Sequence, residues 1–177
     1  NTAVGLLGVI LERVHKKTFE NLLAEIVCTP LGMKDTKQNV PQKDLLRFAQ
    51  GYAVNGDANA SWDFQSFAAA GCIRSTINDM MKYLQANLNT KNASLHAAMQ
   101  LSHKVTSEKD NQKVALGWHI LKPGNDEVVF HNGQTGGYHA YMAFNKEKKS
   151  GVVILSNCAL SMDAAGNELM KWLEKLK

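Results

Sequence analysis

The sequence has little of what assigns a chain to a class of protein at first sight. Its 177 residues include three prolines and three cysteines, and the cysteines lie far apart with no C-x-x-C pair. This spacing predicts neither a disulfide framework nor a zinc knuckle, and each cysteine is expected to be a small buried apolar residue. No run approaches the roughly 18 apolar residues of a membrane span, and no charged-then-apolar export signal opens the chain.

Charge and motif content exclude further classes. The net charge of +4 comes from 20 basic and 16 acidic residues scattered along the chain, and the basic cluster at 146–149 is interrupted by Glu147. A solvated turn accounts for such a cluster better than a nucleic-acid patch does. The chain contains no G-x-S-x-G, H-E-x-x-H, P-loop or G-x-G-x-x-G motif. Its six histidines share no ligand-type spacing. We therefore predict no metal and no cofactor.

Helical patterns fill the first part of the chain, residues 1–105. The opening residues have apolar side chains at helical spacing, namely Val4, Leu7, Ile10, Leu11 and Val14. Thr18 is expected to cap a second helix that runs to Cys28 and is ended by Pro30. Residues 31–70 are expected to form loops with short elements. Thr76 then begins the most regular amphipathic helix of the chain, and Ser94 a shorter one.

Strand patterns follow in residues 106–177. Four runs, 114–121, 127–131, 138–144 and 151–157, are separated by turns at 123–125 and 145–150. Connections this short predict antiparallel neighbours, because a parallel crossover needs a dozen or more residues. Asp163 is expected to cap a final helix whose apolar residues cover the sheet, namely Leu169, Met170, Trp172, Leu173 and Leu176. The pattern predicts an α+β fold, an antiparallel sheet packed by helices, in a single domain over residues 1–177.

The stretch 131–137, HNGQTGG, places a histidine and three glycines at the end of an apolar run. One interpretation is a glycine-rich hairpin whose strand happens to end in histidine. The other is a strand edge that faces a cleft, where glycines let a substrate lie against the backbone and an amide N–H points at a developing oxyanion. The residue types alone leave both open.

Six segments resemble, in the same order, the serine β-lactamase-like hydrolases, which include class C β-lactamases, D-alanyl-D-alanine carboxypeptidases and esterases. They are NTAVGLLGVILERV (1–14), PLGMKDT (30–36), QGY (50–52), AAGCIRSTINDMMKYL (69–84), LGW (116–118) and HNGQTGGYHAYMAFNKEKKSGVVILSN (131–157). The resemblance implies a β-lactamase/transpeptidase-like fold that is incomplete at its amino terminus, since the chain enters a helix at once and does not begin with Met.

The resemblance also implies roles for individual residues. His131, Asn132 and Gly133 stand at the Lys/His-x-Gly motif of the family, with Thr135 and Gly136 continuing the substrate-binding strand. The backbone N–H of Gln134 would be an oxyanion-hole donor, and Asn1 would be the Asn of the Tyr-x-Asn motif, contacting the substrate amide and the catalytic lysine.

Two motifs of the family are missing. No Ser is followed three places later by Lys, and the Tyr of Tyr-x-Asn would precede Asn1. The family's Ser nucleophile, its Lys and its Tyr are therefore expected upstream of this chain, in a missing amino-terminal part of the same protein. Alone, the chain is expected to be inactive.

Two departures from class C enzymes favour an esterase or D-amino-acid peptidase over a dedicated β-lactamase. His131 replaces a lysine and gives a weaker, pH-dependent contact for a substrate carboxylate. The hairpin between Trp118 and Val128 is also short. The resemblance implies a small-molecule or peptide substrate and an exported protein. The alternative is a non-catalytic binding or assembly module on the same scaffold, and a plain helix-on-sheet domain without a site is a third possibility.

Overall fold

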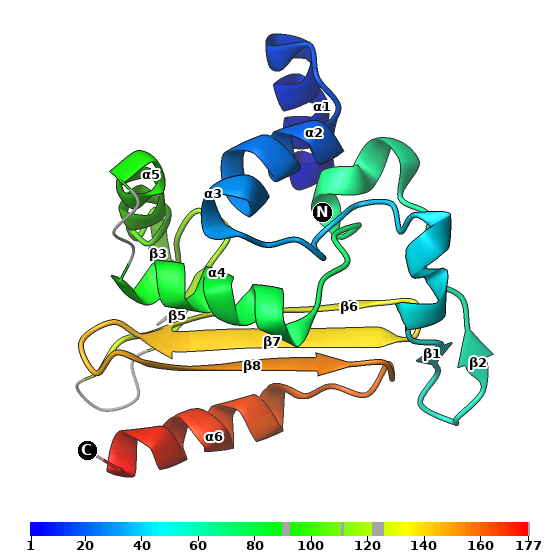
Figure 1. The fold of residues 1–177 in the computed structure, drawn as a ribbon. Coiled ribbons are helices and arrows are strands. Elements are labelled where there is room, and N and C mark those ends of the chain that lie inside the picture. The colour runs from blue at the N-terminus through cyan, green and yellow to red at the C-terminus, as the bar shows by residue number, and fades with distance from the viewer. Residues whose placement is uncertain (90–92, 111, 122–125, 177) are drawn as a thin grey trace.

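An antiparallel sheet lies between two layers of helices (Figure 1). The computed structural model describes residues 1–89, 93–110, 112–121 and 126–176. The turn predicted at 123–125 lies outside these residues. The α+β architecture predicted from the patterning is confirmed.

The elements follow one another in the order expected, helices first and strands later. They are α1 (Thr2–His15), α2 (Phe19–Leu23), η1 (Ala24–Cys28), α3 (Thr29–Leu31), η2 (Gln42–Arg47), β1 (Gly51–Tyr52), β2 (Ala58–Asn59), η3 (Gln65–Ala70), α4 (Ile77–Asn89), α5 (Ala93–Ser102), β3 (Ser107–Lys109), β4 (Gln112–Val114), β5 (His119–Leu121), β6 (Val128–Thr135), β7 (Tyr138–Asn145), β8 (Ser150–Ser156) and α6 (Asp163–Lys175).

The main sheet has the strand order β3-β4-β5-β6-β7-β8, with every neighbouring pair antiparallel. Helix α4 covers one face, where Leu84 packs with Val129 and Phe144. Helix α6 covers the other, where Met170 packs with Val128 and Tyr141. Because successive side chains of a strand point to opposite faces, each strand feeds both cores.

Sequence and structure agree best where the apolar pattern is long. Thr76 accepts a hydrogen bond from the backbone N–H of Asp79 at 3.4 Å, as a capping residue should, and α4 runs on to Asn89. The three longest strands, β6 to β8, occupy the predicted runs within a few residues.

Two local predictions are wrong. Residues 114–121 are not one strand, because Gly117 adopts a left-handed φ of 77° and the N–H of Ala115 donates to the carbonyl of Trp118, which reverses the chain between β4 and β5. The second helix does not end before Pro30. A π-helical segment, η1, leads into α3, where Pro30 lies at the first turn and needs no N–H partner.

The apolar stripe of α1 is not buried. The helix packs against η3 through its glycines, where Gly5 meets Phe67 and Gly8 meets Ala69. Its large apolar side chains are exposed instead, namely Val4, Leu6, Leu7, Ile10, Leu11 and Val14. Helix α6 also departs from expectation, since Met170 is buried and Leu173 packs on the sheet but Leu169, Trp172 and Leu176 are exposed.

The buried polar side chains include Asp79 and His103. Asp79 accepts hydrogen bonds from the N–H of Asp35 (2.7 Å), the hydroxyl of Thr36 (3.0 Å) and the ammonium of Lys82 (2.9 Å). It thereby ties the loop before residue 37 to α4. His103 is 5% exposed and packs edge-on against Trp118 and Phe144.

Candidate active site

Strand β6 is longer than its outer neighbour. It pairs with β5 only from Val128 to Phe130, whereas it pairs with β7 from Val129 to Thr135. Residues 131–135 therefore form a free strand edge among the described residues. This is the stretch in which the resemblance places the substrate-binding strand.

The backbone orientation along this edge follows from the hairpin. A two-residue turn at Gly136 and Gly137 joins β6 to β7, and in such a hairpin the flanking residues, Thr135 and Tyr138, form a hydrogen-bonded pair. Hydrogen-bonded pairs alternate with open ones, so the N–H of Gly133 points at β7 and that of Gln134 points away from it. The N–H of Gln134 thus faces the free edge.

The side chains of β6 divide between the two faces of the sheet. Val129 contacts the α4 core, so His131, Gly133 and Thr135 belong to the α4 side. Val128 and Phe130 contact the α6 core, so Asn132 and Gln134 belong to the α6 side. The amino-terminal end of α1 also lies on the α4 side (Figure 1), where Asn1 is exposed and leaves its side chain uncommitted as a cap.

His131 is exposed at the free edge, and its ring stacks on that of His119 with centroids 5.9 Å apart and planes inclined by 24°. Desolvation by neighbouring atoms lowers the pKa of His131 below its ordinary value, and the charge of His119 lowers it further. The imidazole is therefore mainly neutral at neutral pH. A neutral imidazole can donate or accept a hydrogen bond, unlike the lysine that it replaces.

Asn132 uses its side chain on the opposite face. Its amide donates to a carboxylate oxygen of Asp163 at 2.8 Å, at the first turn of α6. The other oxygen of Asp163 lies 3.5 Å from Nε2 of the buried His139, whose Nδ1 accepts from the N–H of Met162. A substrate contact from Asn132 would therefore come from its main chain.

The glycines of the stretch differ in their surroundings. A Cβ at Gly133 would meet nothing within 4 Å, so the α4 side of the strand is open at this point. A Cβ at Gly136 would lie 2.5 Å from the carbonyl oxygen of Ala60 and 2.6 Å from Trp62. Gly136 is thus packed against protein, and its predicted contact with substrate stays a prediction. Gly137 has a φ of 72° and packs on Gly51.

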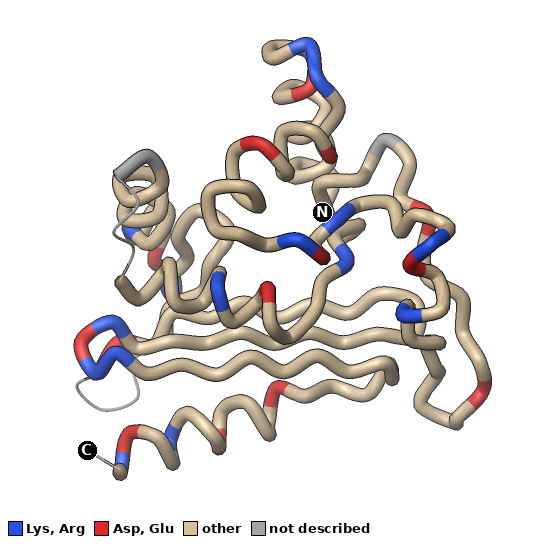
Figure 2. The backbone as a smooth tube through the Cα atoms, in the orientation of Figure 1, with Lys and Arg blue, Asp and Glu red and all other residues tan. Residues whose placement is uncertain are grey.

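The strands around this edge carry no formal charge apart from their histidines. Figure 2 shows β6, β7 and β8 free of lysine, arginine, aspartate and glutamate. Among the described residues, no group of three or more metal-ligating side chains comes together. The electrostatics of the free edge therefore depend on His131, His119 and oriented N–H groups.

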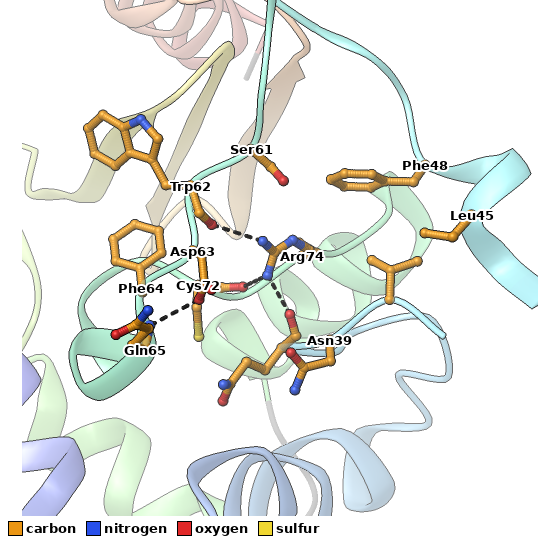
Figure 3. A pocket seen from close by; sticks show the side chains of 12 residues that line it. Asn39, Leu45, Phe48, Ser61, Trp62, Asp63, Phe64, Gln65, Cys72 and Arg74 are labelled. Carbon is orange, nitrogen blue, oxygen red and sulfur yellow. Dashed lines mark hydrogen bonds between the residues drawn. The ribbon is translucent and has the colours of Figure 1, made fainter. Parts of the chain in front are cut away.

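A separate cavity of about 300 Å³ lies beyond the hairpin turn (Figure 3). Its walls include Phe48, Trp62 and Arg74, and it does not include residues 131–135. Trp62 connects the cavity to Gly136, and Phe48 stacks on Tyr138 at 5.7 Å. The cavity therefore borders the hairpin turn and is separate from the free edge of β6.

Asp63 and Arg74 are the charged residues of this cavity, and the guanidinium of Arg74 is occupied by carbonyl groups. It donates to Gln38, to Cys72 at 2.9 Å and to Trp62 at 3.1 Å, and it lies over the ring of Phe48. These bonds join the segment that contains Cys72 and Arg74 to two other segments, near residues 38 and 62. The arrangement fixes the loops that border the hairpin turn.

An antiparallel sheet between helices, with an open strand edge bearing a His-x-Gly motif, defines the β-lactamase/transpeptidase-like class of domains. The chain belongs to the Beta-lactamase family, whose sequence profile matches residues 1–174. No helix among the described residues has the length and apolar character to cross a membrane.

Relatives and solved structures agree with this assignment. The chain is 27% identical to a beta-lactamase of Pseudomonas fluorescens and 26% identical to one of Escherichia coli K12, over 89% of its own length in each case. It spans about half of these relatives, 53% and 50%. The fold is similar to that of a beta-lactamase/D-alanine carboxypeptidase from Pseudomonas syringae, with a TM-score of 0.89, 22% identity and coverage of 100% of this chain and 59% of the other.

The resemblance predicted this family and fold correctly. What it missed is the partner of His131, because no motif of the family draws attention to His119. The available signal was the antiparallel register of two short strands, which would have required the turn at Gly117 to be recognised first.

Proposed function

We propose that the chain is the carboxy-terminal part of a serine acyl hydrolase that acts through an acyl-enzyme. The observation that carries this proposal is the free edge of β6, where the N–H of Gln134 faces outward and the space over Gly133 is open. A backbone N–H so placed can stabilise negative charge on an acyl oxygen as a serine attacks.

The proposed roles follow the resemblance. A serine from the upstream part of the protein attacks the acyl carbon, and water later hydrolyses the ester formed with that serine. Gln134 donates its main-chain N–H to the oxyanion. His131 offers a hydrogen bond to the substrate, Asn1 contacts the substrate amide, and the main chain of residues 132–136 lines the bound substrate.

We propose an uncharged ester or a D-amino-acid peptide as the substrate rather than a β-lactam alone. A mainly neutral His131 attracts a substrate carboxylate weakly, and the neighbouring strands add no cation. The curated relatives are named beta-lactamases, while one solved structure of the same fold is named both beta-lactamase and D-alanine carboxypeptidase. We also infer an exported protein, which cell fractionation would test.

The upstream part of the protein is proposed to pack on α1. Six large apolar side chains of this helix are exposed, from Val4 to Val14. A contiguous apolar face of this kind is unusual on the solvent-exposed surface of a folded protein and marks an interface. Replacing Leu7 with Glu should weaken association between the separately expressed halves, whereas replacing the exposed Arg13 with Gln should not.

The deciding experiment is acylation of the full-length protein by a fluorescent fluorophosphonate, with hydrolysis of a neutral ester followed in parallel. Gln134→Pro removes the outward N–H without removing a ladder hydrogen bond, and Gln134→Ala keeps that N–H. We expect Gln134→Pro to lower kcat/KM by about 100-fold, the order found for one lost oxyanion donor, and Gln134→Ala to stay within about threefold. Equal activity of the two variants would remove Gln134 from the oxyanion hole. Ligand binding without acylation of the wild-type protein would instead identify a binding module.

A further inference from the structure

His119 is the first residue of β5, the outer neighbour of β6, and it lies where the pairing between these two strands stops. It pairs with Phe130, so its backbone lies beside the residue that precedes His131. Its ring contacts both neighbours, with centroids 5.3 Å from Phe130 and 5.9 Å from His131. Because Phe130 and His131 point to opposite faces, the two imidazoles meet around the end of β5, at the free edge itself.

No other described side chain holds the His131 ring in a comparable way. On its own strand pair, His131 is opposite Met142, which is apolar and buried. On β4, Lys113 forms an ion pair with Glu127 at 3.7 Å and pairs in register with Ile120 rather than with His119. The electrostatic influence on His131 among these groups comes from His119.

We propose that His119 is a positioning residue for His131: its ring packs on the imidazole of His131 and holds it at the free edge of β6, and a positive charge on His119 opposes a second positive charge on His131. Two imidazoles at this separation repel each other when both are charged, so the pair takes up its first proton more readily than its second. The role of the pair in catalysis rests on the proposed function, but the coupling between the rings does not.

The consequence for the site is a histidine whose pKa is lowered first by desolvation and then by the charge of a neighbour outside the family's motif. His131 therefore stays available as a neutral hydrogen-bonding group at neutral pH. Once the pair is protonated, the same edge attracts carboxylates and other anions. The substrate preference of the edge should therefore change with pH, from neutral acyl compounds towards anionic ones as the pH falls.

The test is a pH titration of the histidine side chains by NMR in the full protein, comparing His119→Phe with His119→Lys. Phenylalanine keeps a ring over His131 and removes the charge, so the titration midpoint of His131 should move upward. Lysine supplies a permanent positive charge, so the midpoint should move downward. The exposed His96 provides a matched control, and His96→Phe should leave the His131 midpoint unchanged. The low midpoint of the buried His103 reports in every variant that the core is intact.

Opposite movements in the two variants support the proposal. Midpoints that stay fixed, or that move in the same direction, would overturn it. A second measurement separates this proposal from the proposed function. If His131 takes part in turnover, the limb of the kcat/KM profile that depends on it should move to higher pH in His119→Phe, because the midpoint has moved upward. A shifted NMR midpoint with an unshifted profile would keep the coupling and reject the catalytic role of His131.

Discussion

Acid should destabilise this fold through His103. Burial, and then the charge of Lys146, lower the pKa of His103 to about 4. Its Nε2 pairs with the side-chain oxygen of Asn87 at 2.8 Å, and its Nδ1 is buried without a hydrogen-bond partner among the described residues. A protonated ring would bring an additional buried N–H and a charge into contact with Trp118 and Phe144.

The sign and size follow from proton linkage. In the unfolded chain His103 binds a proton as the pH falls below about 6.5, whereas the folded protein resists protonation until about pH 4. Stability is therefore complete above pH 6.5 and is lost as the pH falls between these values. A difference of about 2.5 pH units corresponds to roughly 3 kcal/mol in the free energy of unfolding.

Urea unfolding of the full protein at a series of pH values from 7.5 to 4 would measure this loss. His103→Gln keeps a neutral hydrogen-bonding group and does not titrate, so its stability should fall by about 3 kcal/mol less over the same interval. The matched control is His96→Gln at an exposed helical position, which should follow the wild type. Parallel curves for the wild type and His103→Gln would refute the reasoning, because carboxylates common to both would then explain the whole effect.

Three further predictions concern the site and its support. Gly136→Ala should lower the melting temperature by several degrees, about 1–3 kcal/mol, because its Cβ would lie 2.5 Å from Ala60, whereas Gly133→Ala faces open space and should melt like the wild type. Asp79→Ala should cost about 2–4 kcal/mol in urea unfolding by leaving the N–H of Asp35 without its acceptor and by removing one partner each of Thr36 and Lys82, with the exposed Asp57→Ala as control, and a cost below 0.5 kcal/mol would contradict this account. In the full-length protein, the proposed hydrolase function predicts that His131→Ala lowers kcat/KM by about 10 to 1,000-fold, and a value within twofold of wild type would make His131 a structural strand end.

The sequence predicted best what depends on repeated local pattern. Helix α4 has a capping residue and a long apolar stripe, and β7 and β8 are largely apolar, whereas β6 is apolar only at its start and continues four residues beyond its predicted run. Patterns of this length distinguish a helix from a strand, whereas a short apolar run fits either. The same patterns gave the antiparallel order of these strands, because their connections are too short for any other.

What the sequence did not reveal depends on contacts between distant residues. The reversal at Gly117 lies inside an apolar run that also suits one strand, and only the pairing of Val114 with His119 distinguishes the two. Burial of His103 depends on contacts with Asn87 of α4, Trp118 and Phe144 of β7. The apolar stripe of α1 was a misleading signal for burial. An amphipathic pattern predicts that one face of a helix is buried, but not that residues of this chain bury it.

The candidate site was predicted by resemblance more than by residue pattern. His131 and Gln134 were located through their motif, whereas residue types alone left a plain hairpin equally open. The different surroundings of Gly133 and Gly136 could not be read from the sequence, since both are glycines of one short stretch and differ only in what lies opposite them.

The guanidinium of Arg74 bonds carbonyl groups of its own segment, at residue 72, and of two other loop segments, near residues 38 and 62. The segment near residue 38 is also held to Arg74 by two backbone hydrogen bonds of Lys37, so the side chain of Arg74 matters most for the segment near residue 62. In Arg74→Gln, amide exchange near residue 62 should therefore rise well before the sheet opens. The border of the hairpin turn should then open locally while the rest of the fold stays closed.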